Sequence, residues 1–210
     1  MHSNGRPNPE QLLAAAREGR RECLGTLLEL YRNYLYLVAR TQIDLHLQAQ
    51  VSPSDLVQEA FLEAYRDFGQ FRGRGEKELL GWLRRILVHN LARLVERQVR
   101  AQKRNVRREV SLEVRLKTLE KSAAKVEAAL LCQGSSPSAQ AQRRELAAIL
   151  ADQLAKLPVS HREVIVLRNL EGLTFDEVAR RMGRTSGAVR VLWMRALERL
   201  RQLLKKEDLI

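Results

Sequence analysis

Basic and polar side chains gather at 173–200 in a pattern typical of a helix-turn-helix. Two short helices can cross closely when a small residue, a glycine and a β-branched residue follow at set spacings. This stretch has them as Ala179, Gly183 and Val189. From 180 to 206 there are nine basic residues and one acid, Glu198. Outward side chains at the start of the second helix can meet base edges in the major groove of a duplex. They are Arg184, Thr185, Ser186, Arg190, Val191 and Met194.

A second basic face, at 81–108, has a different composition. This stretch holds nine basic residues and one acid, Glu96. At 100° per residue, leucines line one face of a helix. A tryptophan, a histidine and four arginines share another face: Trp82, Arg85, His89, Arg93, Arg97 and Arg100. Such a face can follow a phosphate backbone while the ring stacks on an unpaired base. The alternative is a solvated arginine face with a half-buried tryptophan, packed under the loop at 68–76.

Local signals predict the helices that position the helix-turn-helix residues. Thr174 and Glu177 form a capping box, which predicts a short helix from about 175 to 182. Gly183 then permits a left-handed turn, and a second helix is expected to start near Ser186. A plain αα-hairpin is the alternative, but the density of basic residues argues against it. Trp193 lies on the apolar stripe of the second helix, so we expect it in the core.

The whole chain has the composition of a basic helical protein. Its 210 residues carry 37 basic and 25 acidic side chains, a formal net charge of +12, which favours a polyanionic partner. Aromatic residues are only 5% of the chain, which favours helices over a sandwich or barrel. We predict an all-α protein of two small helical domains, 10–104 and 143–206, joined by a flexible linker at 105–142. Two linked basic modules suggest contact with two separated DNA sites.

The helices of each domain are predicted from caps and apolar spacing. In the first domain they cover about 10–18, 20–40, 50–68 and 77–104, with Ser52 as the N-cap of the third. The second domain is expected to begin with a helix that ends at Pro158, followed by a helix opened by a capping box at Ser160 and Glu163. Within the linker, 112–131 has a weak helical pattern.

Several functional classes are excluded by what the sequence lacks. The longest apolar run, at 146–151, is far shorter than the roughly 20 residues of a membrane-spanning helix. Cys23 and Cys132 have no C-x-x-C spacing, which excludes a cysteine-based zinc site and fits a reducing cytoplasm. We expect both cysteines to be small buried residues. No signal peptide or catalytic motif is present, so we expect a cytoplasmic protein with no catalytic residue, metal or cofactor.

Three stretches together resemble one family. They are DLVQEAFLEAYRDF at 55–68, WLRRILVHNLARLVERQVRAQKR at 82–104, and the segment from LPVSHREV to RLRQLL at 157–204. Their order resembles that of the extracytoplasmic-function sigma factors, which are dissociable promoter-specificity subunits of bacterial RNA polymerase. The resemblance implies a protein that binds core polymerase and starts transcription at promoters. An anti-sigma factor is a further partner that the resemblance allows.

The resemblance also implies which residues make each contact. Binding to the clamp helices of the β′ subunit is expected from Asp55, Leu56, Gln58, Glu59 and Leu62. Recognition and melting of the −10 element is expected from Trp82, Arg85, His89, Asn90, Arg93, Arg97 and Arg100. Recognition of the −35 element, next to the β flap, is expected from Arg184, Thr185, Ser186, Ala188, Arg190, Val191, Met194 and Arg195.

The sequence departs from the family pattern at two places. The family usually has Asn seven residues after the motif tryptophan, where this chain has His89 followed by Asn90, so either side chain can be the one that contacts the −10 base. After Arg190 the small polar residue and arginine of the family are replaced by Val191 and Leu192, which favours contact with thymine methyl groups. Two rival functions are a helix-turn-helix regulator that acts without polymerase and an enzyme that acts on DNA.

Overall fold

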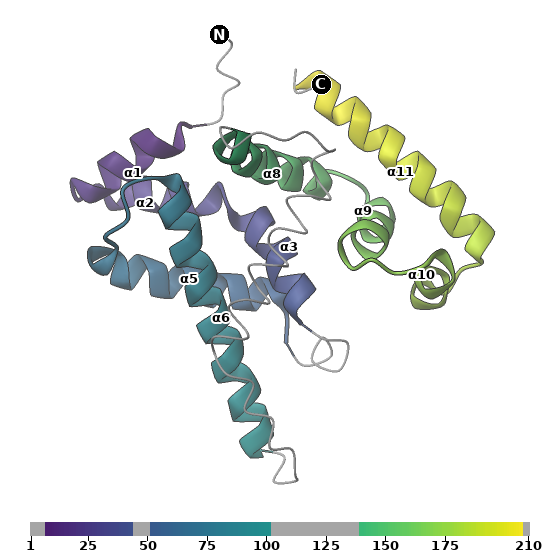
Figure 1. Cartoon of the computed structure of the whole chain (residues 1–210), viewed down its shortest axis with the longest axis horizontal. Helices are drawn as coiled ribbons and strands as arrows, with labels where there is room; N and C mark the ends of the chain where they lie inside the picture. Colours follow the sequence, from purple (N-terminus) through teal and green to yellow (C-terminus); the bar gives the residue numbers. More distant parts are fainter. Residues whose placement is uncertain (1–6, 44–50, 102–138, 208–210) are drawn as a thin grey trace. The chain divides into compact units, whose positions relative to one another are not determined.

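The structure, a computed structural model, describes residues 7–43, 51–101 and 139–207. All regular secondary structure in these ranges is helical, so the all-α prediction is confirmed. The described residues up to 101 form one compact unit and those from 139 form another (Figure 1). The predicted linker lies outside the described residues up to position 138, as does the weak helical pattern at 112–131.

The described residues of the first unit form five α-helices. They are α1 (Pro9–Arg17), α2 (Arg21–Glu29), α3 (Arg32–Gln42), α5 (Pro53–Asp67) and α6 (Glu76–Ala101). The single helix predicted over 20–40 is wrong, because the chain leaves helical geometry at Tyr31, whose φ is −110°. Tyr31 is fully buried, so this break places its ring in the core while α2 and α3 take separate directions.

Helix α5 begins and packs as its sequence predicts. The Ser52 hydroxyl accepts a hydrogen bond from the backbone N–H of Asp55 at 3.5 Å, and Pro53 is the first helical residue. One face of the helix is buried against α3 and α6: Leu56, Val57, Ala60, Phe61 and Ala64. The opposite face is exposed.

Helix α6 runs for 26 residues without interruption, and its sequence contains no proline (Figure 1). Its first half buries Leu79, Leu80, Leu83, Ile86, Leu87 and Val88. Burying a leucine side chain contributes about 2 kcal/mol relative to leaving it exposed. This packing fixes the rotation of α6 about its own axis, and that rotation determines which basic side chains face outward.

The described residues of the second unit form four α-helices and one π-helical turn. They are α8 (Ala139–Ala155), α9 (Val159–Ile165), the turn (Val166–Leu170), α10 (Phe175–Met182) and α11 (Ser186–Lys206). Helix α8 starts inside the predicted linker, at Ala139. The predicted capping box at Ser160 is wrong, since α9 already starts at Val159, after Pro158, and has no side-chain cap. The proline fixes the entry of the chain, so the helix begins before Ser160.

The helix-turn-helix forms as predicted. Thr174 and Glu177 make both hydrogen bonds of the capping box, with the backbone N–H of Thr174 donating to the Glu177 carboxylate at 2.7 Å. Gly183 has a φ of +62°, the left-handed region in which a Cβ is disfavoured. Thr185 caps α11 through a 3.3 Å hydrogen bond from the N–H of Ala188. Strong caps on both sides of a tight turn fix the orientation of α11 relative to α10.

Candidate nucleic-acid interface

The basic face of α6 is exposed along most of its length. Arg85, His89 and Arg97 are exposed, and Trp82 at the start of the face is half-buried. The side chain of Arg100 lies outside the described residues. Arg93 is the one residue of this face that forms an ion pair with another described residue. Exposed arginine side chains such as Arg85 and Arg97 can contact a phosphate backbone.

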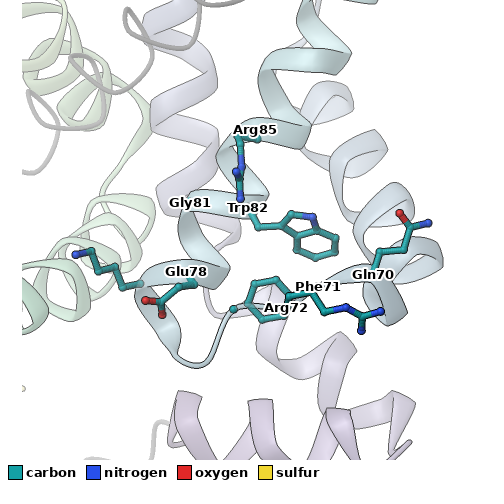
Figure 2. A pocket seen from close by; sticks show the side chains of 9 residues that line it. Gln70, Phe71, Arg72, Glu78, Gly81, Trp82 and Arg85 are labelled. Atoms are coloured by element: carbon teal, nitrogen blue, oxygen red, sulfur yellow. The ribbon is translucent and has the colours of Figure 1, made fainter.

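An aromatic hollow opens beside Trp82 (Figure 2). Its volume is about 380 Å³, and its walls come from the loop after α5 and the first turns of α6: Phe71, Gly73, Lys77, Glu78, Trp82 and Arg85. The Trp82 ring centroid lies 5.2 Å from that of Phe71 and 6.3 Å from that of Phe68. The tryptophan therefore packs on the loop, as the alternative interpretation predicts, and also lines an open hollow.

The loop that forms one wall of this hollow is held by two features. A Cβ on Gly73 would collide with the Phe71 ring and with the Cβ of Glu78, so only glycine allows this close approach. Arg17 donates hydrogen bonds to the carbonyls of Gly73 and Arg74, the latter at 3.4 Å. Its guanidinium also lies 5.7 Å from the Phe71 ring centroid. Sequence reasoning misses Arg17, because its partners are more than fifty positions away.

The outward face of α11 is more exposed than that of α6. Seven of its eight predicted residues are exposed, and the eighth, Ser186, is half-buried. Val191 and Met194 are large apolar side chains that are 46% and 62% exposed. Exposed apolar side chains between arginines suit contact with thymine methyl groups in a major groove. The predicted recognition residues thus lie in the turn before α11, at its N-cap and along its first three turns.

The inner side of α11 contacts the rest of the second unit. Val189 and Ala196 are buried, and the other residues of the apolar stripe are half-buried. Trp193 donates a hydrogen bond from Nε1 to Asn169 Oδ1 at 2.9 Å and meets Phe175 edge-on with centroids 5.6 Å apart. Its contacts are therefore internal, as predicted, although the side chain is only half-buried. Sequence reasoning misses Phe175, which also contacts two arginines.

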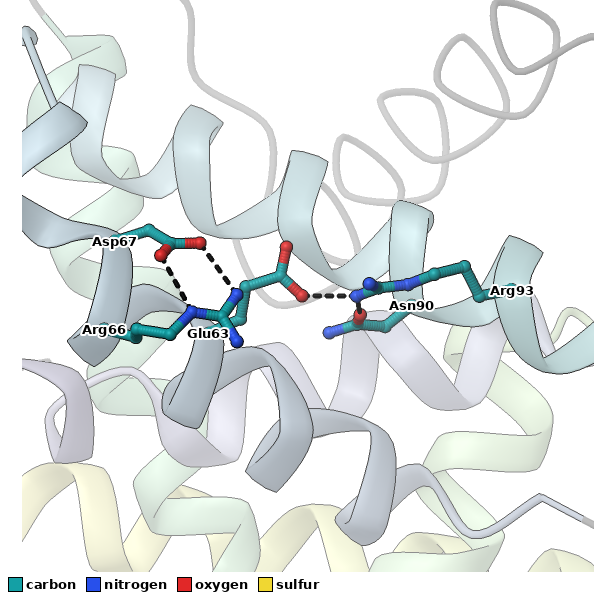
Figure 3. Close-up of polar contacts among 5 residues, drawn as sticks. All are labelled: Glu63, Arg66, Asp67, Asn90 and Arg93. Carbon is teal, nitrogen blue, oxygen red and sulfur yellow. Dashed lines mark hydrogen bonds and ion pairs between the residues drawn. The ribbon is translucent and has the colours of Figure 1, made fainter.

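A shallow groove of about 410 Å³ lies between α5 and α6. Glu59, Leu62 and Glu63 line it from α5, while Arg93 and Arg97 line it from α6. Arg93 donates hydrogen bonds to Glu63 and to Asn90 Oδ1 (Figure 3). The groove therefore joins residues of two sites that the sequence treats separately.

A second charged pair flanks the groove on α5 (Figure 3). Arg66 donates to both carboxylate oxygens of Asp67, at 2.9 and 3.0 Å. These hydrogen bonds lower the pKa of Asp67 and raise the pKa of Arg66. Arg66 is therefore hydrogen-bonded to Asp67 within α5, whereas Glu63 is paired with Arg93 of α6.

Comparison with known proteins assigns both units to one family. The model described as Sigma-70 region 2 matches residues 27–104, and the model described as Sigma-70, region 4 matches residues 147–200. The ECF RNA polymerase sigma-E factor of Haemophilus influenzae is 30% identical over 145 residues, covering 69% of this chain and 70% of that protein. The chain belongs to the extracytoplasmic-function sigma factors. The identification made from the sequence is thereby confirmed.

Other relatives extend the match to most of the chain. The ECF RNA polymerase sigma-E factor of Escherichia coli is 32% identical over 144 residues, 69% of each chain. The ECF RNA polymerase sigma factor SigD of Mycobacterium tuberculosis is 28% identical over 193 residues, 91% of this chain and 82% of that protein. The solved structure of CnrH in complex with the cytosolic domain of CnrY aligns over 94% of this chain and 97% of that one, with 22% identity and a TM-score of 0.31.

Membership of the sigma factors makes the protein a polymerase-associated initiation factor. It binds core RNA polymerase and promoter DNA, and a regulator that acts without polymerase is not favoured. Within the described residues, no helix is long and apolar enough to cross a membrane. Among the same residues, no group of three His, Cys, Asp or Glu side chains gathers as a metal site.

Two predicted site residues of the sigma factor are not on its surface. Asn90 is 2% exposed, with its Oδ1 bound by Arg93, so its amide is part of the interior and His89 is the exposed residue of the pair. Leu56 lies on the buried side of α5, whereas Asp55, Gln58, Glu59 and Leu62 are exposed. Helical spacing places Asn90 between Leu79 and Leu83 on the buried side of α6, and Leu56 at the edge of the buried side of α5. Cys23, expected to be buried, is half-buried, and Cys132 lies outside the described residues.

Proposed function

We propose that the two basic faces divide promoter recognition according to the form of the DNA. The hollow beside Trp82, with His89 and the exposed arginines of α6, takes the unpaired strand of the −10 element. The outward face of α11, from Arg184 to Arg195, takes the −35 element as a duplex. The observation that carries this division is shape: the α6 face has a hollow with an aromatic wall, while the α11 face is a projecting helix.

The hollow suits an unstacked base for two physical reasons. An aromatic wall offers stacking worth about 1–3 kcal/mol per base, which compensates for the loss of stacking in the duplex. Arg85 at the rim and Arg97 further along α6 can hold the phosphates of the same strand. His89, about two helical turns beyond Trp82, can donate a hydrogen bond to a base edge or accept one from it.

The α11 face suits a duplex because its side chains project. Arg190 is exposed in the second turn, where it can make a bidentate contact with guanine. Val191 and Met194 can contact thymine methyl groups beside it. Arg184, in the turn before α11, and Arg195, in the third turn of the helix, suit phosphate contacts.

Polymerase docking is assigned to the exposed side of α5. Leu62 is 67% exposed, and Asp55, Gln58 and Glu59 surround it with polar and acidic groups. An exposed leucine with acidic groups in the preceding turns suits a docking surface for a partner with apolar and basic groups. We assign the chemistry of RNA synthesis to the polymerase and none to this chain, and we place the protein in the cytoplasm with its polymerase and DNA.

A double substitution tests the docking surface. Gln58→Ala with Glu59→Arg should reduce co-purification with core polymerase, because it removes an amide and reverses a charge beside Leu62. Gln11→Ala with Glu10→Arg makes the same change on the exposed face of α1 and should leave co-purification unchanged. Circular dichroism should show the same helical signal for both variants. Equal polymerase binding by both would contradict the docking assignment.

Promoter choice is tested by transcription. Core polymerase reconstituted with this protein and a library of promoters should enrich templates that share a −35 and a −10 element at one fixed spacing. Binding to duplex DNA at equal affinity with and without polymerase would instead favour a regulator that acts alone.

A further inference from the structure

The ring of Phe175 connects the first helix of the helix-turn-helix to the DNA-facing residues of the second. Its centroid is 5.1 Å from the guanidinium carbon of Arg190 on α11 and 4.8 Å from that of Arg168 in the π-helical turn. Trp193 meets the same ring at an interplanar angle of 77°. A single side chain of α10 therefore contacts two other elements, and one of its partners lies on the proposed −35 face.

Neighbouring contacts hold this ring in place. Phe175 is the first residue of α10, directly after the N-cap residue Thr174. Arg168 donates to the carbonyl of Leu173 at 3.0 Å, two residues before Phe175, which fixes the entry to the helix. Trp193, the edge-on neighbour, is itself held by its hydrogen bond to Asn169. The ring is therefore packed against two side chains, Arg168 and Trp193, that are themselves hydrogen-bonded.

The contact with Phe175 leaves the hydrogen-bonding groups of Arg190 unused. Arg190 is exposed, and it forms no hydrogen bond or ion pair with any residue in the described part of the chain. A guanidinium over an aromatic face is attracted by the ring quadrupole, and its N–H donors are not consumed. A free arginine loses rotamer freedom when it binds a base, whereas an arginine already held by a ring loses less.

We propose that Phe175 is a positioning residue that holds Arg190 in place for the −35 element. The ring supplies specificity indirectly, since it orders the side chain that contacts the base and contacts no base itself. This inference rests on the proposed role of Arg190 in −35 recognition. The competing explanation is that Phe175 only packs the second unit, in which case its effect would not depend on Arg190.

A double-mutant cycle in the reconstituted holoenzyme separates these explanations. The variants are Phe175→Leu, Arg190→Ala and their combination, and the measurement is holoenzyme affinity for a promoter fragment by fluorescence anisotropy. Phe175→Leu removes the ring but retains apolar volume at the start of α10. We expect it to weaken promoter binding about two- to fivefold with Arg190 present, the size of an exposed cation–π contact. We expect no further loss when Arg190 is already alanine.

Two controls make the result specific. Phe175→Tyr keeps a ring over the guanidinium and should bind like the parent chain. A promoter library should show that Phe175→Leu weakens preference at the same −35 position as Arg190→Ala, with other positions unchanged. Thermal unfolding of each variant reports any general loss of structure.

Each outcome decides a separate point. Equal losses from Phe175→Leu in both Arg190 backgrounds would mean that the ring acts through packing, and the inference would be overturned. No loss from Phe175→Leu, with a clear loss from Arg190→Ala, would overturn the inference but leave −35 recognition by Arg190 intact. No loss from Arg190→Ala would overturn the proposed −35 role and the positioning role with it.

Discussion

The two basic helices of this sigma factor, α6 and α11, carry similar charge but present it differently. Along α6 the charges border a hollow, and Arg93 is already paired with Glu63 of the neighbouring helix. Along α11 the cations project, and Arg190 contacts an aromatic ring instead of a carboxylate. One surface is built around an aromatic wall and the other around exposed donors. Net charge alone would not distinguish them.

This difference fits the proposed binding of two forms of DNA by one chain. An unpaired strand offers base faces, which a ring such as Trp82 can stack against. A duplex offers only base edges and phosphates, which extended side chains on a helix can reach. If the hollow and the projecting helix perform separate tasks, a substitution in one should leave the task of the other intact.

The largest effect is expected from Trp82→Ala. Loss of the stacking wall should reduce open-complex formation by about 1–3 kcal/mol, roughly 5- to 150-fold, because a captured base loses its platform. Permanganate reactivity of −10 thymines measures the opening. Polymerase binding and −35 contact should be spared, since both lie on other helices.

A pre-melted −10 bubble sharpens the Trp82 test. The bubble removes the cost of opening but not the need for strand capture, so it should not fully restore the variant. Trp82→Phe keeps a ring against Phe71 and should retain most activity. If Trp82→Ala opens promoters as well as the parent does, the hollow is only a packing feature of the loop.

A smaller effect should separate His89 from Asn90. His89→Ala should reduce opening while leaving the thermal unfolding midpoint unchanged, because its side chain is exposed. Asn90→Ala should lower the midpoint, since it removes a buried group that accepts a hydrogen bond from Arg93. The opposite pattern, with Asn90→Ala stable and defective in opening, would return −10 contact to the asparagine.

Arg17→Ala should have a moderate effect on the same hollow. Arg17 holds the carbonyls of Gly73 and Arg74, so its loss should loosen one wall and reduce opening by about 1 kcal/mol, roughly fivefold. Arg20→Ala is the matched control, because Arg20 pairs only with the nearby Glu18 on the surface. If both variants behave alike in the permanganate assay, the loop does not need Arg17.

The smallest effect concerns pH and only the second unit. Hydrogen bonds from the backbone N–H and hydroxyl of Thr174 lower the pKa of Glu177 below its ordinary value of 4.5. A lowered pKa in the folded state means that the carboxylate stabilises the fold above pH 4.5, and that this contribution is lost as the pH falls through the lower folded value. The cap of α10 should therefore weaken in acid.

Two variants measure this cap. Thr174→Ala should destabilise the second unit by about 1 kcal/mol at neutral pH, as for other N-cap threonines. Glu177→Gln cannot titrate, so the difference in unfolding midpoint between parent and variant should shrink as the pH falls below 4.5. A difference that stays constant with pH would contradict the assigned pKa shift.

Local sequence determines the parts of the fold that depend on hydrogen bonds over three or four positions. The caps at Ser52 and Thr174 and the left-handed turn at Gly183 all form as predicted, because each is decided within one turn of helix. The ordered motifs likewise identify the family, since they reflect whole segments and not single contacts. The Ser160 cap and the single helix over 20–40 are wrong where a proline and a buried tyrosine override local pattern.

Helical spacing predicts which residues of the candidate site share a face, but not which of them are exposed. Spacing at 100° per residue says which side chains share a face, yet the width of the buried sector depends on the helix packed beside it. Asn90 and Leu56 are both buried, so both leave the predicted surfaces. Asn90 shares the leucine side of α6 by its spacing from Leu83 and Leu87, whereas Leu56 lies at the edge of the apolar side of α5, where packing decides its burial.

Only the tertiary structure decided which distant side chains meet. Arg93 pairs with Glu63, thirty positions earlier in the chain. Arg17 donates hydrogen bonds to a loop that lies more than fifty positions later. Phe175 contacts Arg190 from a different helix, although nothing in the motif marks it. Sequence determined the helices, their caps and the charge of their faces, because those follow from neighbours along the chain. The hollow, the groove and the ring beneath Arg190 arise from contacts between helices, which depend on packing in three dimensions.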